Sequence, residues 1–426
     1  MRFPRKGVIM YSYEIKQVIQ LRPHQQKALD ALARYSKGIC VFPTGGGKTN
    51  VGIFDAKHQF DNNYGETLIV VVAPRILLAE QLSSEYLEFI TNASVMHVHS
   101  GETHHFSTTK PNEIHNWVKQ TRGNKLIFTT YNSLQQLAKA DVHVNTIYFD
   151  EAHNSVQRHF FPAVEHFSQE ADRCYFFTAT PKYSSTVAKP GMNDTDVYGQ
   201  IIAKVPAPEL VQGGYIIPPK VVAKQLQMVQ KGDNIANRDR DNLLDVLEEN
   251  PVNKILICAK ATKHIINLLS QTDFAEVVAE QGYSVMHITA KHGGFIDGQK
   301  VNREVFFDTL NGWGKDPDKK FIVLHHSILA EGINISALEA VVFMRDMDIV
   351  GIGQTVGRTL RLHPDDAAGI REGRIAAGNL ESYTKSYGLV IVPVFSKSTA
   401  SAAKKIQNVV DIIFEKGDVA VSTIRR

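Results

Sequence analysis

The chain has 426 residues, of which 43% are hydrophobic and 21% are charged, and this is the composition of an ordinary globular protein of two or three domains. Lys and Arg total 47 against 44 Asp and Glu, so any surface that attracts polyanions must be a local patch. We find no apolar run of membrane length and no signal-peptide core. We therefore expect a soluble, intracellular protein that resides in the cytoplasm, or in the host cytoplasm if it is viral.

The three cysteines are widely separated, and each lies in or beside an apolar run. Cys40, Cys174 and Cys258 are therefore expected to be buried structural thiols in a reducing compartment, with no disulfide framework and no zinc site. Residues 1–14 are expected to form a loose, basic N-terminal arm.

Short β-rich runs alternate with longer segments of helical spacing, which is typical of parallel sheets built from right-handed crossovers. The predicted strands are 38–42, 67–73, 95–99, 125–130, 146–149 and 174–178, then 254–258, 284–288, 320–325, 340–344 and 388–394. Prolines and glycines interrupt the chain between the two sets. We predict an α/β fold with a first domain at 15–205, a linker at 206–219, a second domain at 220–397, and a C-terminal helix and tail at 398–426.

The residues that carry chemistry begin with the segment 42–49, of sequence FPTGGGKT, which follows an apolar stretch and precedes a helical pattern. This is the layout of a loop whose backbone N–H groups converge on phosphate oxygens. Lys48 would reach the outer phosphates and Thr49 would hold magnesium. The strict pattern has glycine at position 42, where Phe42 stands, so this segment alone does not exclude a chance glycine-rich turn.

Two carboxylates follow the predicted strand 146–149 directly. Asp150 at a strand end beside a phosphate loop is suited to holding Mg²⁺, directly or through water. Glu151 is placed to accept a proton from a water molecule that attacks the terminal phosphate, or to orient it.

Taken together, the motifs resemble those of a superfamily-two DNA helicase, in the family's order, from about Leu21 to Arg361. That family does not require glycine at the start of its phosphate loop. The matching segments are 21–25 (LRPHQ), 72–75 and 78–81 (motif Ia), 129–131, 150–153 (the DEAH form of motif II), 178–181 (motif III), 330–334 (motif V) and 354–361 (motif VI). The closest likeness is to type III restriction and UvsW-like phage and viral helicases, which implies two RecA-like domains with a nucleotide cleft between them.

The resemblance also implies which residues form the site. The expected catalytic residues are Lys48, Asp150, Glu151, Gln354, Arg358 and Arg361. ATP is expected to contact Gln25, which would read the adenine edge, and Pro43, Thr44, Gly45, Gly46, Gly47, Lys48, Thr49, Gly332 and Asn334. Mg²⁺ is expected at Thr49 and Asp150, and nucleic acid at Pro74, Arg75, Thr129, Thr130 and Tyr131. Arg358 and Arg361 are three residues apart, so both can face the cleft and stabilise a transferring phosphoryl group when the domains close.

The function that these expectations favour is an ATP-dependent DNA helicase or translocase, with hydrolysis stimulated by nucleic acid. Two alternatives stay open, namely an RNA helicase and an ATP-gated DNA-binding clamp or subunit of a larger restriction, repair or viral assembly. DNA is favoured over RNA because the chain lacks the DEAD form and has little sequence after motif VI for accessory modules. A C-terminal helical stripe that includes Ile406 and Val410 is expected to dock on its own domain rather than on a protein partner.

One histidine cluster invites a metal site. His97, His99, His104 and His105 crowd one stretch, yet no cysteine or carboxylate cluster accompanies them in the sequence. A strand followed by a polar loop is the favoured interpretation.

Overall fold

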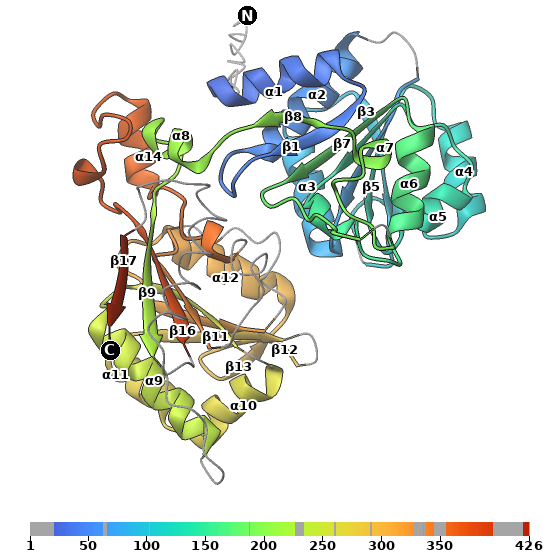
Figure 1. Ribbon diagram of the computed structural model, residues 1–426. Helices are drawn as coiled ribbons and strands as arrows, with labels where there is room; N and C mark the ends of the chain where they lie inside the picture. The colour runs from blue at the N-terminus through green and yellow to red at the C-terminus, as the bar shows by residue number, and fades with distance from the viewer. Residues whose placement is uncertain are drawn as a thin grey trace, which may run out of the picture.

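The computed structural model describes residues 21–62, 66–101, 103–186, 188–225, 234–259, 261–289, 292–326, 335, 337–344, 355–394 and 421–425. Gly332, Asn334 and Gln354 lie outside the described residues, as do the N-terminal arm and the stripe at Ile406 and Val410. Figure 1 shows two α/β domains, with the chain leaving the first through β8 and α8 and entering the second as β9.

The first domain is built on an eight-stranded parallel sheet of order β4-β3-β5-β2-β6-β7-β1-β8. Its strands are β1 (Lys37–Val41), β2 (Leu68–Ala73), β3 (Ala93–Val98), β4 (Phe106–Ser107), β5 (Asn124–Thr130), β6 (Thr146–Phe149), β7 (Arg173–Thr178) and β8 (Ile201–Lys204). All six strands predicted for this half are present. The central strand β2 is buried along its whole length, as expected for a parallel strand covered on both faces.

Helices cover both faces of this sheet. They are α1 (Pro23–Arg34), α2 (Lys48–Asn62), α3 (Ile76–Leu87), α4 (Pro111–Gln120), α5 (Leu134–Lys139), α6 (Phe161–Glu170) and α7 (Thr195–Tyr198), with a short 3₁₀ turn η1 (Ala152–Asn154). Helix α8 (Ala207–Gln212) follows β8 on the way to the second domain (Figure 1). One core contains Leu32, Val51 and Leu82 of α1 to α3, and a separate core contains Leu137 and Val164 of α5 and α6. Each face of the sheet therefore has its own hydrophobic layer.

The second domain has a nine-stranded sheet of order β13-β12-β11-β14-β10-β15-β16-β9-β17. Its strands are β9 (Pro219–Gln225), β10 (Lys254–Cys258), β11 (Ser284–Thr289), β12 (Gly293–Ile296), β13 (Gln299–Val301), β14 (Phe321–His325), β15 (Ala340–Phe343), β16 (Gly388–Val394) and β17 (Val421–Arg425). The hairpins at β11-β12 and β12-β13 are antiparallel, and the other pairs are parallel. The predicted α/β fold of two RecA-like domains is confirmed.

The helices of the second domain are α9 (Ile235–Glu249), α10 (Thr262–Gln271), α11 (Phe274–Glu280), α12 (Arg303–Lys315) and α14 (Pro364–Arg371), with a 3₁₀ turn η2 (Leu380–Ser382). Leu247, Ile265 and Phe274 of α9 to α11 pack on one face of the sheet. All three cysteines are buried, as predicted. Among the described residues, none of the helices combines the length and the apolar character needed to cross a membrane.

Candidate nucleotide site

The loop at 42–49 joins β1 to α2, which begins at Lys48. Phe42 extends the strand edge, because its N–H donates to the carbonyl of Thr178 at 3.0 Å and its side chain is only 1% exposed. The position where the strict pattern has glycine is thus filled by a core residue. The positive end of α2 faces the loop, as a phosphate site requires.

Two of the loop glycines adopt a left-handed backbone. Gly45 has φ +86° and Gly47 has φ +79°, a region that side chains other than glycine rarely adopt. A Cβ atom at Gly47 would also lie 2.2 Å from Nε2 of Gln25. Both the backbone and the surroundings therefore require glycine at position 47.

Three side chains at the start of α1 hold the carbonyls of the loop glycines. Arg22 Nη1 donates to the Gly45 carbonyl at 3.1 Å, His24 Nε2 to that of Gly46 at 2.8 Å, and Gln25 Nε2 to that of Gly47 at 3.1 Å. These bonds fix the peptide orientation of the loop and place the proton of neutral His24 on Nε2. With these carbonyls held on the side of α1, the peptides of the loop have a fixed orientation, and the N–H of Gly46 donates to the carbonyl of Pro43 at 2.9 Å.

Gln25, the residue expected to read adenine, is 1% exposed and is bonded within the protein at both ends of its amide. Its Oε1 accepts from the N–H of Arg22 at 2.9 Å, and its Nε2 donates to the loop. Here it supports the phosphate loop, and its contact with adenine stays a prediction. Next to it, the guanidinium of Arg22 lies 4.7 Å from the ring centre of Tyr215, and both residues line the cleft. Sequence reasoning missed His24 and Tyr215, since only the tertiary contacts reveal them.

The acidic pair follows β6 at the carboxyl edge of the sheet. Lys48 Nζ lies 3.8 Å from Oε1 of Glu151 and 3.5 Å from the carbonyl of Phe42. Desolvation and, to a smaller extent, the charge of Glu151 raise the pKa of Asp150, the charge of Lys48 lowers it, and the result is a pKa of about 7. A carboxylate in this setting is stabilised by an added cation, which fits the Mg²⁺ expected here.

Glu151 itself has a left-handed backbone, with φ 44° and ψ 52°. Such a conformation is unfavourable for a residue other than glycine and is typical of functional sites. The neighbouring His153 connects two motifs, because its Nδ1 lies 3.2 Å from Thr178 Oγ1 and 3.6 Å from Glu151 Oε2. The hydroxyl of Thr178 in turn accepts from the N–H of Thr180 at 3.2 Å.

The second domain contributes arginines to the same cleft. Arg358 and Arg361 line it together with Lys48, Asp150 and Glu151, and its volume is about 490 Å³. This size suits a ligand as large as a nucleotide. The predicted juxtaposition of loop, acidic pair and arginines is therefore the arrangement that the structure has.

Motif VI packs directly against the phosphate loop. A Cβ atom at Gly357 would lie 2.3 Å from Cβ of Thr44, and the N–H of Ile217 donates to the carbonyl of Leu360 at 2.8 Å. Behind this segment, Nζ of the buried Lys385 donates to three backbone carbonyls. These belong to Leu338, Thr359 and Arg361, at 2.6, 2.7 and 3.1 Å.

Among the residues expected to contact nucleic acid, Arg75 is exposed and precedes α3. Pro74, Thr129, Thr130 and Tyr131 are buried. The Thr129 hydroxyl donates to the carbonyl of Val98 at 2.9 Å, and the Tyr131 hydroxyl donates to that of Asp150 at 2.9 Å. Tyr131 thus connects β5 to the acidic pair, while contact of this set with nucleic acid stays a prediction.

Comparisons with known proteins agree with this geometry. Residues 18–183 match the protein family described as type III restriction enzyme, res subunit. None of the curated proteins compared with the chain matches it.

Three solved structures share the fold. The Type ISP restriction-modification enzyme LlaBIII, bound to DNA, aligns with 96% of this chain at 18% sequence identity and a TM-score of 0.69. A nuclease-deletion mutant of the Type ISP enzyme LlaGI, in complex with a DNA substrate mimic, aligns with 94% of this chain at 18% sequence identity and a TM-score of 0.65. The chain covers 31% and 30% of those two proteins, so it spans about a third of their length. A single-residue variant of Dbp5 from S. cerevisiae, bound to RNA and ADP BeF3, aligns with 94% at 14% identity and a TM-score of 0.56, and 89% of it is covered.

The site residues suit ATP with Mg²⁺, the pair that superfamily-two ATPases use. Left-handed glycines open the loop N–H groups to phosphates, and the acidic pair lies across from the second-domain arginines. The motif order, the fold and the matched domain agree, and residues 18–183 of this chain are similar to the res subunit of type III restriction enzymes.

Proposed function

We propose that this protein hydrolyses ATP and uses the reaction to move along DNA or to unwind it. The observation that carries the proposal is the single cleft in which Lys48, Asp150 and Glu151 of one domain face Arg358 and Arg361 of the other. Each group has a role in phosphoryl transfer to water, and the set is complete only when both domains contribute.

In the proposed reaction, the phosphates of ATP lie on the loop N–H groups, and Lys48 exchanges its contact with Glu151 for the outer phosphates. Glu151 then takes a proton from the attacking water. Arg358 and Arg361 stabilise the negative charge on the transferring phosphoryl group. Thr49 and Asp150 would hold Mg²⁺, which when bound neutralises charge on the phosphate oxygens.

Coupling to nucleic acid is supported by contacts that connect the acidic pair to two other segments of the first domain. His153 connects Glu151 to Thr178 of motif III, and Tyr131 connects Asp150 to the end of β5. A shift of the acidic pair during hydrolysis would therefore displace residues at two strand ends on the same edge of the sheet.

DNA is the proposed polynucleotide because the matched family is that of a restriction-enzyme subunit and LlaBIII is bound to DNA in its structure. Dbp5 shares the fold and is bound to RNA, so RNA must be one arm of the test. The decisive experiment measures ATP hydrolysis by the purified chain with duplex DNA, single-stranded DNA and RNA at matched salt. Stimulation by DNA at least about tenfold above that by RNA is expected.

Two substitutions test the assigned chemistry. Lys48→Ala removes the cation that meets the phosphates, and Glu151→Gln removes the proton acceptor, so each should lower kcat by about 10³-fold. Glu151→Gln should keep ATP binding, because an amide replaces the carboxylate at the same size. Lys57→Ala, at an exposed lysine of α2, is the matched control and should hydrolyse ATP like the wild type.

A strand-displacement assay and a triplex-displacement assay then separate unwinding from movement along the duplex. Displacement of a paired strand supports a helicase, and displacement of a third strand alone supports a translocase. Hydrolysis that no polynucleotide stimulates would contradict the proposal.

A further inference from the structure

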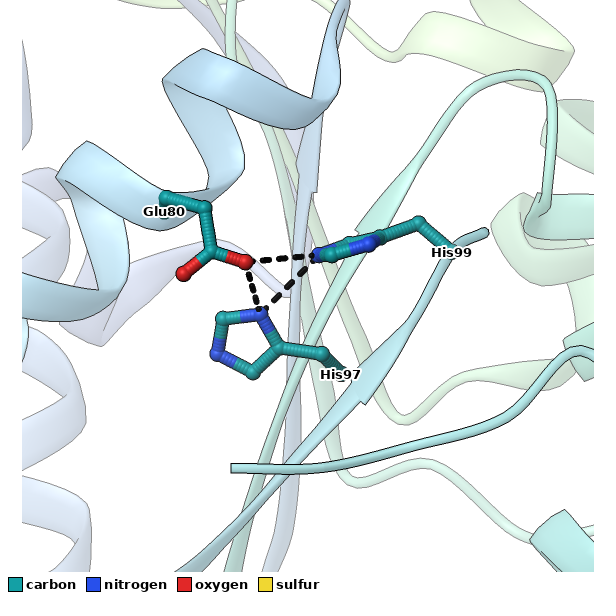
Figure 2. A group of neighbouring side chains, drawn as sticks. All are labelled: Glu80, His97 and His99. Carbon is teal, nitrogen blue, oxygen red and sulfur yellow. Dashed lines mark hydrogen bonds and ion pairs between the residues drawn. The ribbon is translucent and has the colours of Figure 1, made fainter. Parts of the chain in front are cut away.

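Glu80, His97 and His99 bring three polar atoms together at the edge of the first domain, outside the nucleotide cleft (Figure 2). Glu80 Oε1 lies 3.0 Å from His97 Nδ1 and 3.1 Å from His99 Nε2, and the two ring nitrogens are 3.0 Å apart. Glu80 belongs to α3, His97 to β3, and His99 follows β3 directly. The carboxylate that was not found beside the histidines in the sequence is thus supplied by a helix that precedes them.

When Glu80 is ionised, the hydrogen bonds of this triangle bring two ring nitrogens close together at one carboxylate oxygen. Gly101 N–H donates to His99 Nδ1 at 3.2 Å, which places the proton of neutral His99 on Nε2, inside the triangle. If His97 carries its proton on Nδ1, both N–H groups donate to Glu80 Oε1, and the two donor nitrogens lie 3.0 Å apart. If the proton is on Nε2, a nitrogen lone pair faces the Glu80 oxygen. A metal ion at the centre would instead accept a lone pair from each of the three atoms, so that neither ring nitrogen in the triangle carries a proton.

The spacing and the outer contacts favour a metal ion. An ion bound at ~2.0–2.1 Å places neighbouring ligand atoms ~2.9 Å apart in octahedral and ~3.3 Å apart in tetrahedral geometry, and the distances of 3.0–3.1 Å here lie between the two. His97 Nε2 lies 3.0 Å from the Ser83 hydroxyl, and the Thr103 hydroxyl donates to Glu80 Oε2 at 3.2 Å. Such outer partners orient ligands in metal sites.

Burial also keeps both rings in the form that a metal ion requires. His97 and His99 are 0% and 2% exposed. Burial in a low-dielectric setting favours the neutral imidazole, which has a lone pair available for an ion. At His99 an ion on Nε2 would move the ring proton to Nδ1, and the amide of Gly101 would turn away.

We propose that Glu80, His97 and His99 bind one divalent transition-metal ion of the zinc type. Two imidazoles and one carboxylate suit Zn²⁺, Co²⁺, Ni²⁺ or Fe²⁺, whereas Mg²⁺ and Ca²⁺ prefer oxygen ligands. The side chain of Glu80 is 30% exposed, so the ion has a path from solvent and room for water as a further ligand. This ion is separate from the Mg²⁺ of the nucleotide cleft.

The ion would join α3 to β3. Helix α3 begins directly after the exposed Arg75, and the carbonyl of Val98, between the two histidines, accepts from Thr129. Both Arg75 and Thr129 belong to the set predicted to contact nucleic acid. The ion therefore holds rigid the part of the first domain that carries these residues.

The test uses the full-length chain, freed of metal by chelation, and titrates it with Zn²⁺ or Co²⁺ in the presence of excess Mg²⁺. One equivalent of Zn²⁺ should bind and raise the melting temperature, and Co²⁺ should give a visible absorption spectrum typical of nitrogen and oxygen ligands. Glu80→Gln and His97→Gln should each weaken binding by at least ~100-fold and abolish that spectrum. His143→Gln is the matched control, because His143 is 62% exposed and pairs with Asp172 elsewhere.

Glu80→Gln keeps the test decisive if His97→Gln does not fold, since Glu80 is partly exposed and its amide can still accept from Thr103. Its metal-free circular dichroism and melting should match those of the metal-free wild type. Binding and cobalt spectra that are equal in wild type and Glu80→Gln would overturn the proposal. So would a wild type that binds no zinc. None of these readouts depends on ATP or DNA.

Discussion

At the residue scale, His24 shows how a buried histidine can stabilise a loop and also make it sensitive to acid. Its Nε2–H donates to the Gly46 carbonyl, yet desolvation is the largest influence and lowers its pKa below 6.5. The charges of Arg22 and Lys27 lower it further, while the bond to Gly46 and the charge of Glu209 raise it. The ring is therefore held neutral at a position where protonation is unfavourable.

This depression predicts a pH dependence of stability. Below pH ~6.5 the unfolded chain binds a proton that the folded chain resists, so the contribution of His24 is present above pH ~6.5 and is lost as the pH falls. The unfolding free energy of the wild type, minus that of His24→Gln, should decrease by up to ~1.4 kcal/mol per pH unit below pH ~6.5. Urea unfolding of both proteins between pH ~5 and ~7.5 measures it. A difference that does not change with pH would contradict the assignment.

Some residues of the candidate sites can be recognised from the sequence, and others can be found only from tertiary contacts. Lys48, Asp150 and Glu151 are recognisable because each follows an apolar strand at a fixed offset, and parallel strands bring such ends to one edge. Gln25 is recognisable as a motif residue, but its partner Gly47 is not, because the contact depends on how α1 packs against the loop. Glu80 lies 17 residues before His97, so no local pattern connects them.

At the element scale, motif VI and the phosphate loop are in contact through a glycine. Gly357→Ala would place a methyl group 2.3 Å from Cβ of Thr44, and the two segments must then separate. Because a displacement of ~1 Å can cost ~10²-fold in rate, kcat of ATP hydrolysis should fall by between ~10-fold and ~100-fold.

The matched test of this contact is a double-mutant cycle. Thr44→Gly removes the atom that the new methyl group meets, so adding it to Gly357→Ala should recover part of the lost rate. Steady-state ATPase kinetics of the two single variants and the double variant measure the coupling. Purely additive effects would show that the rate loss has another origin.

Elements with an uninterrupted apolar run were predictable, and those without one were not. All eleven predicted strands are present, because buried parallel strands have long runs of Val, Ile and Phe. The strand β9 is absent from the prediction because it begins at Pro219, a residue that is typical of linkers yet tolerated at the first position of a strand. The strand β17 lies where only a tail was expected. Short outer strands such as β4 and β13 have too few residues to show a period.

At the scale of the whole molecule, the two domains contribute different parts of one reaction. In the proposed reaction, ATP binding depends mainly on the first domain, whereas stabilisation of the phosphoryl group needs the arginines of the second domain that line the same cleft. Arg361→Ala should therefore leave the ATP dissociation constant within a few-fold of the wild-type value and lower kcat by about 10³-fold.

Nucleotide-binding titrations and single-turnover hydrolysis of Arg361→Ala separate these two effects. Arg371→Ala is the control, because Arg371 is exposed at the end of α14 in the same domain. A loss of ATP affinity as large as the loss of rate would show that Arg361 acts in binding rather than in catalysis.

The three bonds from α1 to the loop carbonyls have a consequence for nucleotide exchange. A loop whose peptides are already oriented loses little entropy when ATP arrives, so ATP can associate without a slow ordering step. In the proposed reaction, product release would leave the loop in the same form, so that separation of the domains rather than ordering of the loop is expected to limit turnover. The start of the first helix is thereby expected to affect the rate of nucleotide exchange, although it lies outside the phosphate loop.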